Sequence, residues 1–416
     1  MDARHGVEPG RRGAWWTRGL LTVLALLVGP VGTFLAGPVG TGVRPAYAAE
    51  PQVPALPSTV RDRCLGGSPV VARTASWGSQ RLGPAAVWPL SRGDGVLVAV
   101  LDSGVSAAVP ALAGAVLPGT DAVSGDGPAD RDCRGRGTLL ASLVVARPRS
   151  GSAVTGLAPA ARILPVRVVS DDGKVPGGVV AQGVRAAVDA GASVLLVTAG
   201  PTADTADLRD AIAVAAARDV VVVASVGTGS GSESGPVWYP AAYPGVLAVG
   251  GVDAVGVPVQ QIAVGQRVDL VAPGTDVTGS APAGSGHYRA GGSAPAAAQV
   301  AGVVALVRAR YPHLTAPEVR RRLLDTARRP PGVPGQSALI GAGMVDGYAA
   351  VAALSTAPQA GAGPNATLLR LPTASGRSVR AQWAAAIGGG VLLLTCLGAG
   401  GVLTVRHGRR RRWRSR

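Results

Sequence analysis

The fold is decided by the stretch Val96-Leu97-Val98-Ala99-Val100-Leu101-Asp102-Ser103-Gly104-Val105. Its first six side chains are all apolar, which is typical of a short strand that is buried on both faces, as parallel strands are. Asp102 follows directly, so we expect its carboxylate at the carboxyl end of this strand. Open α/β sheets place their chemistry at that edge. Taken alone, Asp102 is equally well explained as a turn or helix-capping residue.

The chain from Gly95 to about Ala353 alternates apolar strands with helical segments. This alternation predicts an α/β domain with a central parallel sheet that helices cover on both faces. The predicted strands are 160–168, 193–197 and 220–223, and the predicted helices are 177–190, 206–219, 297–309 and 315–327, the last with Thr315 as its N-cap.

The first 48 residues have the features of a signal peptide. Arg11, Arg12 and Arg18 give a basic start, 20–28 is a short apolar run, and 46–48 is Ala-Tyr-Ala, which predicts cleavage before residue 49. An uncleaved anchor is the alternative. Residues 49–84 are Pro-rich, and we expect an irregular extension that lies over the body of the protein.

The C-terminal part has the pattern of a membrane anchor. Residues 384–405 carry no charge over a length that crosses the hydrocarbon core, so they predict one transmembrane helix, with a buried globular helix as the alternative. Residues 355–383 are rich in small residues and Pro and predict a linker. The basic tail 406–416 is expected in the cytoplasm and the middle of the chain outside the cell membrane.

The net charge of +16 does not indicate nucleic-acid binding, because it is concentrated at the two ends. Of the three cysteines, Cys396 lies in the predicted span, whereas Cys64 and Cys133 lie in the exported part, where disulfides persist. A disulfide between these two is the simplest interpretation. The four histidines are scattered, so neither a metal site nor a cofactor is predicted.

Several further segments resemble those of the subtilisin-like serine proteases, and they occur in the family's order. They are 98–105 around Asp102, 156–160, the substrate-lining strand 194–200, 239–250 and 271–274. The resemblance implies a subtilisin-like three-layer fold over residues 85–354 and the activity of a serine-type endopeptidase.

The same resemblance places other residues where the family has its catalytic groups. The segment 132–138 is similar to the histidine segment, and Arg136 stands between two glycines where the histidine is expected. In 292–302, Ala294 stands at the position of the serine, with Ser293 one residue before it. Thr228 stands where the family has its oxyanion asparagine. Asp102 keeps the position of the aspartate.

These departures predict loss of proteolysis. Arginine stays protonated and accepts no proton, and alanine has no nucleophile. Thr228 retains at best a weak hydroxyl donor. We expect Arg136 to pair with Asp102 in a bidentate fork. The alternative is a rescued site in which Ser293 attacks and His287 swings in as the base.

The signal peptide, the extension, the paired cysteines, the protease body and the basic-tailed span together resemble the mycosins, the membrane-anchored subtilases of actinobacterial type VII secretion systems. That resemblance implies subunits of the secretion membrane complex as partners. The leading hypothesis is a catalytically inactive pseudoprotease that acts as an extracytoplasmic scaffold. The alternatives are an active endopeptidase with a non-standard site, and a module that binds an extended peptide along 197–200 without cutting it.

Overall fold

The computed structural model describes residues 52–60, 64–227, 236–259, 265–329, 338–353 and 379–410. The chain divides into two compact units, Met1–Ala353 and Leu354–Arg416. The predicted signal peptide, Thr228 and residues 411–416 of the basic tail lie outside the described residues.

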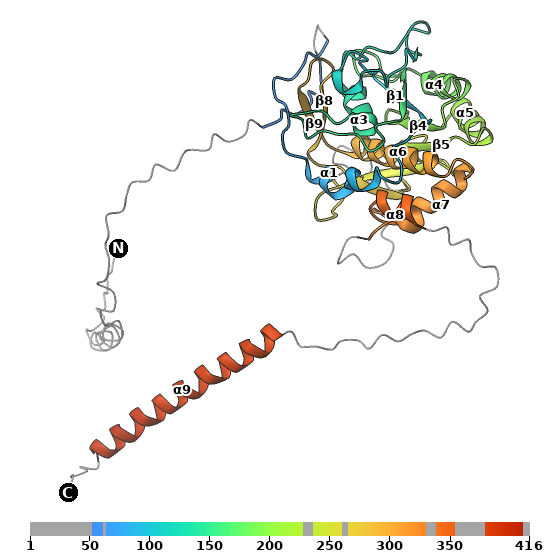
Figure 1. The fold of residues 1–416 in the computed structure, drawn as a ribbon. Helices are drawn as coiled ribbons and strands as arrows, with labels where there is room; N and C mark the ends of the chain where they lie inside the picture. Colours follow the sequence, from blue (N-terminus) through green and yellow to red (C-terminus); the bar gives the residue numbers. More distant parts are fainter. Residues whose placement is uncertain are drawn as a thin grey trace, which may run out of the picture. The chain divides into compact units, whose positions relative to one another are not determined.

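The first unit is built on a parallel sheet in the order β2-β3-β1-β4-β5-β6-β7 (Figure 1). Its strands are β1 (Leu97–Asp102), β2 (Thr120–Asp121), β3 (Arg162–Arg167), β4 (Val194–Val197), β5 (Val221–Ser225), β6 (Leu247–Val252) and β7 (Leu270–Pro273). An antiparallel hairpin of β8 (Val277–Ser280) and β9 (His287–Ala290) stands apart from the sheet. The predicted parallel sheet is therefore confirmed.

Helices cover both faces of the sheet, which gives the three predicted layers (Figure 1). Alternate residues of β1 point to opposite faces, as the period of a strand requires. Val98 and Val100 pack with α3 (Arg136–Val145) and α6 (Ser293–Arg310), whereas Ala99 and Leu101 pack with α4 (Val179–Asp189) and α5 (Ala206–Ala217). By the same alternation, Asp102 belongs to the face of α3 and α6.

The remaining helices lie before β1 and after α6, apart from one short 3-10 turn between β1 and β2. They are α1 (Trp77–Leu82), α2 (Pro84–Val87), the 3-10 turn η1 (Pro110–Leu112), α7 (Ala316–Thr326) and α8 (Gly347–Ala352). Thr315 is the N-cap of α7, as predicted, and its backbone N–H donates to Glu318 at 2.8 Å. Helix α6 begins four residues before the predicted start at 297, because Gly292 turns the chain directly into the first helical turn.

The N-terminal extension lies over the β8–β9 hairpin, as expected. The Leu56 N–H donates to the Arg289 carbonyl at 2.7 Å, the Arg289 N–H donates to Pro54 at 2.8 Å, and the His287 N–H donates to Val70 at 2.8 Å. The Cys64–Cys133 disulfide is present and joins this extension to the loop before α3. The extension is not irregular throughout, because it ends in α1, whose N-terminus Ser76 caps.

The second unit contains α9 (Val379–Arg410). The predicted span 384–405 lies within this helix, which begins inside the predicted linker; residues 354–378 lie outside the described part. Among the helices that the structure describes, none combines the length and the apolar character that crossing a membrane requires. The predicted transmembrane helix is therefore not confirmed.

Candidate active site

Asp102 is the last residue of β1, and its side chain is fully buried. Each of its carboxylate oxygens has a partner from the surrounding strands. Oδ1 accepts the Ser103 N–H at 2.8 Å, and Oδ2 accepts the hydroxyl of Thr198, the residue after β4. A buried carboxylate is stable only when it is paired in this way, so the site needs these donors to hold the charge.

Arg136 is the first residue of α3 and reaches the same carboxylate. Its Nη2 lies 3.1 Å from Asp102 Oδ2 and also donates to the Thr198 carbonyl at 2.6 Å. The predicted ion pair is confirmed, but the predicted bidentate fork is wrong. A single guanidinium nitrogen makes the contact, because Nη2 is also hydrogen-bonded to the Thr198 carbonyl after β4.

Asp132 fixes the loop that presents Arg136, and the sequence analysis missed it. Its Oδ1 accepts the Gly135 N–H at 2.8 Å and the Ser103 hydroxyl at 2.9 Å, while its Oδ2 accepts the Thr138 N–H at 2.8 Å. Desolvation by burial raises the pKa of Asp132 to about 6. The sequence did contain a signal for this arrangement. Asp132 lies six residues before Thr138, with Gly135 between them, and an aspartate just before a helix often accepts hydrogen bonds from N–H groups of its first turn.

Ser293 and Ala294 occupy the first turn of α6. Ser293 is fully buried, and its hydroxyl donates to the Gly227 carbonyl at 2.7 Å. Its proton is thus committed to a backbone acceptor after β5, and no base among the described residues contacts it. Trp238, also missed, packs on Gly227, since a Cβ there would meet the indole ring at 2.1 Å. The Ser293 hydroxyl is therefore shielded from solvent and hydrogen-bonded to the backbone.

His287, the base in the rescued alternative, is engaged elsewhere. It lies in β9 with 3% exposure, its Nδ1 accepts the Ala72 N–H at 3.0 Å, and its Nε2 is 3.3 Å from Ser152 Oγ. Because Nδ1 accepts, the neutral ring carries its proton on Nε2, the wrong tautomer for accepting a proton from a serine through that nitrogen. His287 does not contact Ser293.

The burial of His287 makes stability depend on pH, because desolvation holds its pKa below the ordinary value of 6.5. The unfolded chain then binds the proton more readily, so the contribution is complete above pH 6.5 and is lost as pH falls below it. Asp132, whose pKa is raised to about 6, acts in the opposite direction over the same range, so the effect of His287 is read as a difference between two proteins. We expect the urea midpoint of the unaltered chain, relative to that of His287→Gln, to fall between pH 7 and pH 5. An unchanged pH profile in that variant would contradict this; His313→Gln is the control.

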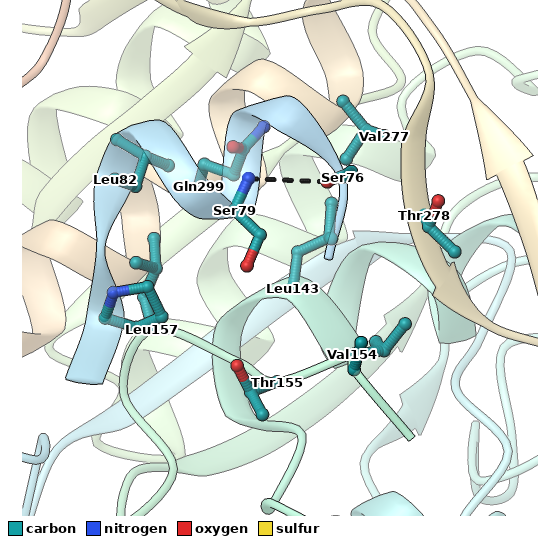
Figure 2. Close-up of a pocket in the computed structure, with 12 residues that line it drawn as sticks. Ser76, Ser79, Leu82, Leu143, Val154, Thr155, Leu157, Val277, Thr278 and Gln299 are labelled. Atoms are coloured by element: carbon teal, nitrogen blue, oxygen red, sulfur yellow. Dashed lines mark hydrogen bonds between the residues drawn. The ribbon is translucent and has the colours of Figure 1, made fainter. Parts of the chain in front are cut away.

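Two hollows of very different size lie near these elements. One of about 30 Å³ between α1 and α3 has room for a single water, and Figure 2 shows Ser79, Thr155 and Leu143 around it. The other, about 600 Å³, is a shallow groove between the extension and the start of α6, lined by Ala55, Leu56 and Gly292 among others. Of these two hollows, the groove next to α6 is the one with room for a peptide side chain.

The stretch 197–200, predicted to pair with a peptide, already has partners inside the protein. The Thr198 carbonyl accepts Arg136 and, at 3.2 Å, the Ser225 hydroxyl. Gly200 packs so closely on Tyr239 that a Cβ would lie 1.9 Å from the Tyr239 carbonyl oxygen. Strand addition along this stretch would therefore compete with these internal contacts.

The parallel sheet is covered by helices on both faces, and the aspartate at the end of β1 contacts the first residue of α3. This arrangement defines the protein as an α/β protein of the subtilisin type. The model of the subtilase family of S8 peptidases matches residues 93–343. The chain belongs to the subtilase family.

Similar proteins include mycosins as well as subtilisins. The chain is 36% identical to Mycosin-4 of Mycobacterium tuberculosis over 320 residues, which cover 66% of this chain and 68% of that protein. It is 35% identical to subtilisin BL of Lederbergia lenta over 67% of this chain and 99% of that one. The solved structure of the MycP3 protease from the type VII (ESX-3) secretion system superposes with a TM-score of 0.58 at 29% identity, over 73% of this chain and 99% of that one.

Proposed function

We propose that this protein is a mycosin-like pseudoprotease, which serves a type VII secretion complex as an extracytoplasmic partner and does not cut peptides. The observation that carries the proposal is the Arg136–Asp102 contact at 3.1 Å. In a subtilase the aspartate orients a histidine that takes the serine's proton. Here the aspartate is neutralised by a permanent cation, which accepts no proton.

The nucleophile's surroundings support the same proposal. Ala294 has no reactive group, and Ser293 is buried and donates to the Gly227 carbonyl. Activating Ser293 would require a base to replace that carbonyl as acceptor of the proton. His287 is held in β9 by the Ala72 N–H, so it does not supply this base.

We expect the purified protein to remain unlabelled by a fluorophosphonate probe, which reacts only with an activated serine. A variant that combines Arg136→His, Ala294→Ser and Thr228→Asn restores the family's residues and is the matched positive control. In-gel fluorescence of both proteins, with circular dichroism to verify folding, gives the readout. Labelling of the unaltered chain that disappears in Ser293→Ala would support the active-endopeptidase alternative and reject the pseudoprotease.

The role as a partner is tested separately from the loss of catalysis. The similar MycP3 protease comes from the type VII (ESX-3) secretion system. We expect the full chain, extracted from membranes with mild detergent, to co-purify with the membrane subunits of such a system. Elution as a free monomer under conditions that keep that complex intact would reject the scaffold role.

The same proposal includes a location at the outer face of the cell membrane, which rests on two features of the sequence. Export by residues 1–48 and retention by residues 384–405 would keep the first unit outside the cell membrane. Protease added to spheroplasts is then expected to digest the first unit and to spare an epitope placed on the tail 406–416. Extraction of the whole chain by alkaline carbonate would contradict retention by a membrane span.

The peptide-binding alternative is favoured by one observation, the groove of about 600 Å³ beside the start of α6. Saturable binding of an extended peptide that is recovered intact, and that weakens on Gly291→Trp, would support this second function.

A further inference from the structure

Another cavity, of about 240 Å³, lies between the residues after α3, the β8–β9 hairpin and the N-terminal extension. Two arginines line it, Arg73 from the extension and Arg149 after α3. Hydroxyl groups come from Ser150, Ser152, Ser280 and Ser285, and His287 completes the polar side chains. All the lining residues are described, and none of them is acidic. The cavity is therefore lined by positive charge and by hydrogen-bond donors.

The hydroxyl of Ser152 has its oxygen occupied from within the protein. It accepts the Val154 N–H at 3.2 Å and lies 3.3 Å from His287 Nε2. Since Nδ1 of His287 accepts the Ala72 N–H, Nε2 carries the proton of the neutral ring and donates it to Ser152. The Ser152 proton is then directed to some other acceptor, and the cavity is the space next to it.

Ser280 provides an independent sign of a missing acceptor. It pairs directly with His287 across the antiparallel hairpin, so the two side chains lie on the same face. Ser280 is 2% exposed, and its hydroxyl has no hydrogen-bond partner in the described part of the chain. Buried polar groups are hydrogen-bonded as a rule, and each exception needs an explanation. A bound group that offers acceptor oxygens would provide one.

The two arginines indicate the charge of such a group. Arg149 is held at the rim of the cavity by a hydrogen bond from Nη1 to the Pro110 carbonyl at 3.2 Å, which leaves the rest of its guanidinium for a ligand. The planar guanidinium matches the spacing of phosphate oxygens. The volume of the cavity accommodates a phosphate group with a small substituent.

We propose that this cavity binds a phosphate group, with Arg73 and Arg149 balancing its charge and with Ser152 and Ser280 donating to its oxygens. The site differs from the candidate active site. Arg136 begins α3 and this cavity lies beyond its last residue, so about 15 Å of helix separates them at ~1.5 Å per residue. The proposal holds whether or not the protein cuts peptides.

The test is calorimetric titration of the purified full chain with sodium phosphate, against sodium chloride at matched ionic strength. We expect saturable binding with one phosphate per chain. Arg149→Gln should weaken it at least about tenfold, as loss of a charge-assisted hydrogen bond does. Ser280→Ala should also weaken binding while leaving the thermal stability of the unliganded protein unchanged or higher, since it removes a hydroxyl that lacks a partner.

Arg218→Gln is the matched control, because Arg218 is an exposed arginine at the end of α5, which covers the opposite face of the sheet. If it weakens binding as much as Arg149→Gln, the interaction is general electrostatic attraction and the proposal fails. The absence of saturable binding tighter than about 1 mM for every phosphate probe also overturns it.

The same chemistry has two sources, a soluble phosphate ester or a lipid headgroup, and two further probes separate them. Binding of glycerol 3-phosphate that depends on Arg149 assigns the cavity to soluble phosphates. Sedimentation with phosphatidylglycerol vesicles that depends on Arg149, without binding of the soluble ester, assigns it to lipid.

Discussion

Replacing Arg136 by methionine is expected to lower the free energy of unfolding by about 3 kcal/mol, the lower end of what breaking a buried ion pair costs. Asp102 is fully buried and would lose its cationic partner, keeping only the Ser103 N–H and the Thr198 hydroxyl. The lower end applies because the Arg136 side chain is 34% exposed, which lets water screen the pair. Urea denaturation at pH 7 measures the change.

A double-mutant cycle isolates the interaction between the two side chains. In a protein that already carries Asp102→Asn, Arg136→Met should lower the free energy of unfolding by much less, because no buried charge is then left without its partner. Arg134→Met is the matched control. Among the described residues its guanidinium donates to the carbonyls of Asp171 and Ser58 and pairs with no carboxylate, so we expect this change to lower the free energy of unfolding by less than about 1 kcal/mol. Equal costs of Arg136→Met with and without Asp102 would show that the pair contributes nothing.

Replacing Cys64 and Cys133 together by serine is expected to lower the free energy of unfolding by about 4 kcal/mol, since the cross-link closes a long loop and restricts the unfolded chain. The two cysteines are separated by 69 positions in the sequence. Urea denaturation of the double variant and of the reduced unaltered chain should give the same loss.

Cys396→Ser controls for the change of residue type, because Cys396 lies in the second unit and is expected to leave the stability of the first unit unchanged. If the double variant and the unaltered chain unfold at the same urea concentration under oxidising conditions, the disulfide does not stabilise the fold.

The sequence was sufficient to predict the sheet and the placement of Asp102, because both depend on local patterns. A continuous apolar run predicts a buried parallel strand, and its last residue necessarily lies at the carboxyl edge. The pairing of Arg136 with Asp102 was also predictable once the family's histidine position had been recognised. The geometry of the pair was not predictable, because the Thr198 carbonyl that also binds Arg136 comes close only when β4 lies beside β1.

The groups that the sequence analysis missed or misplaced depend on contacts between distant segments. His287 was considered as a base because of its closeness in sequence to Ser293, but the Ala72 N–H, 215 positions away, decides its tautomer. Trp238 covers Gly227 after a stretch of chain that no periodic pattern describes. Asp132 accepts five hydrogen bonds from backbone N–H and hydroxyl groups. Only the glycine and threonine that follow it pointed to this role.

The contacts of the extension with β9 have a consequence for self-association. An uncovered strand edge is a template on which another molecule's chain adds a further strand. Residues 54–56 and 70 occupy the N–H and C=O groups along the outer side of β9. Trimming the chain at about residue 75 would uncover this row of groups, so a shortened protein should form oligomers and fibrous precipitates under conditions where the untrimmed protein stays dispersed.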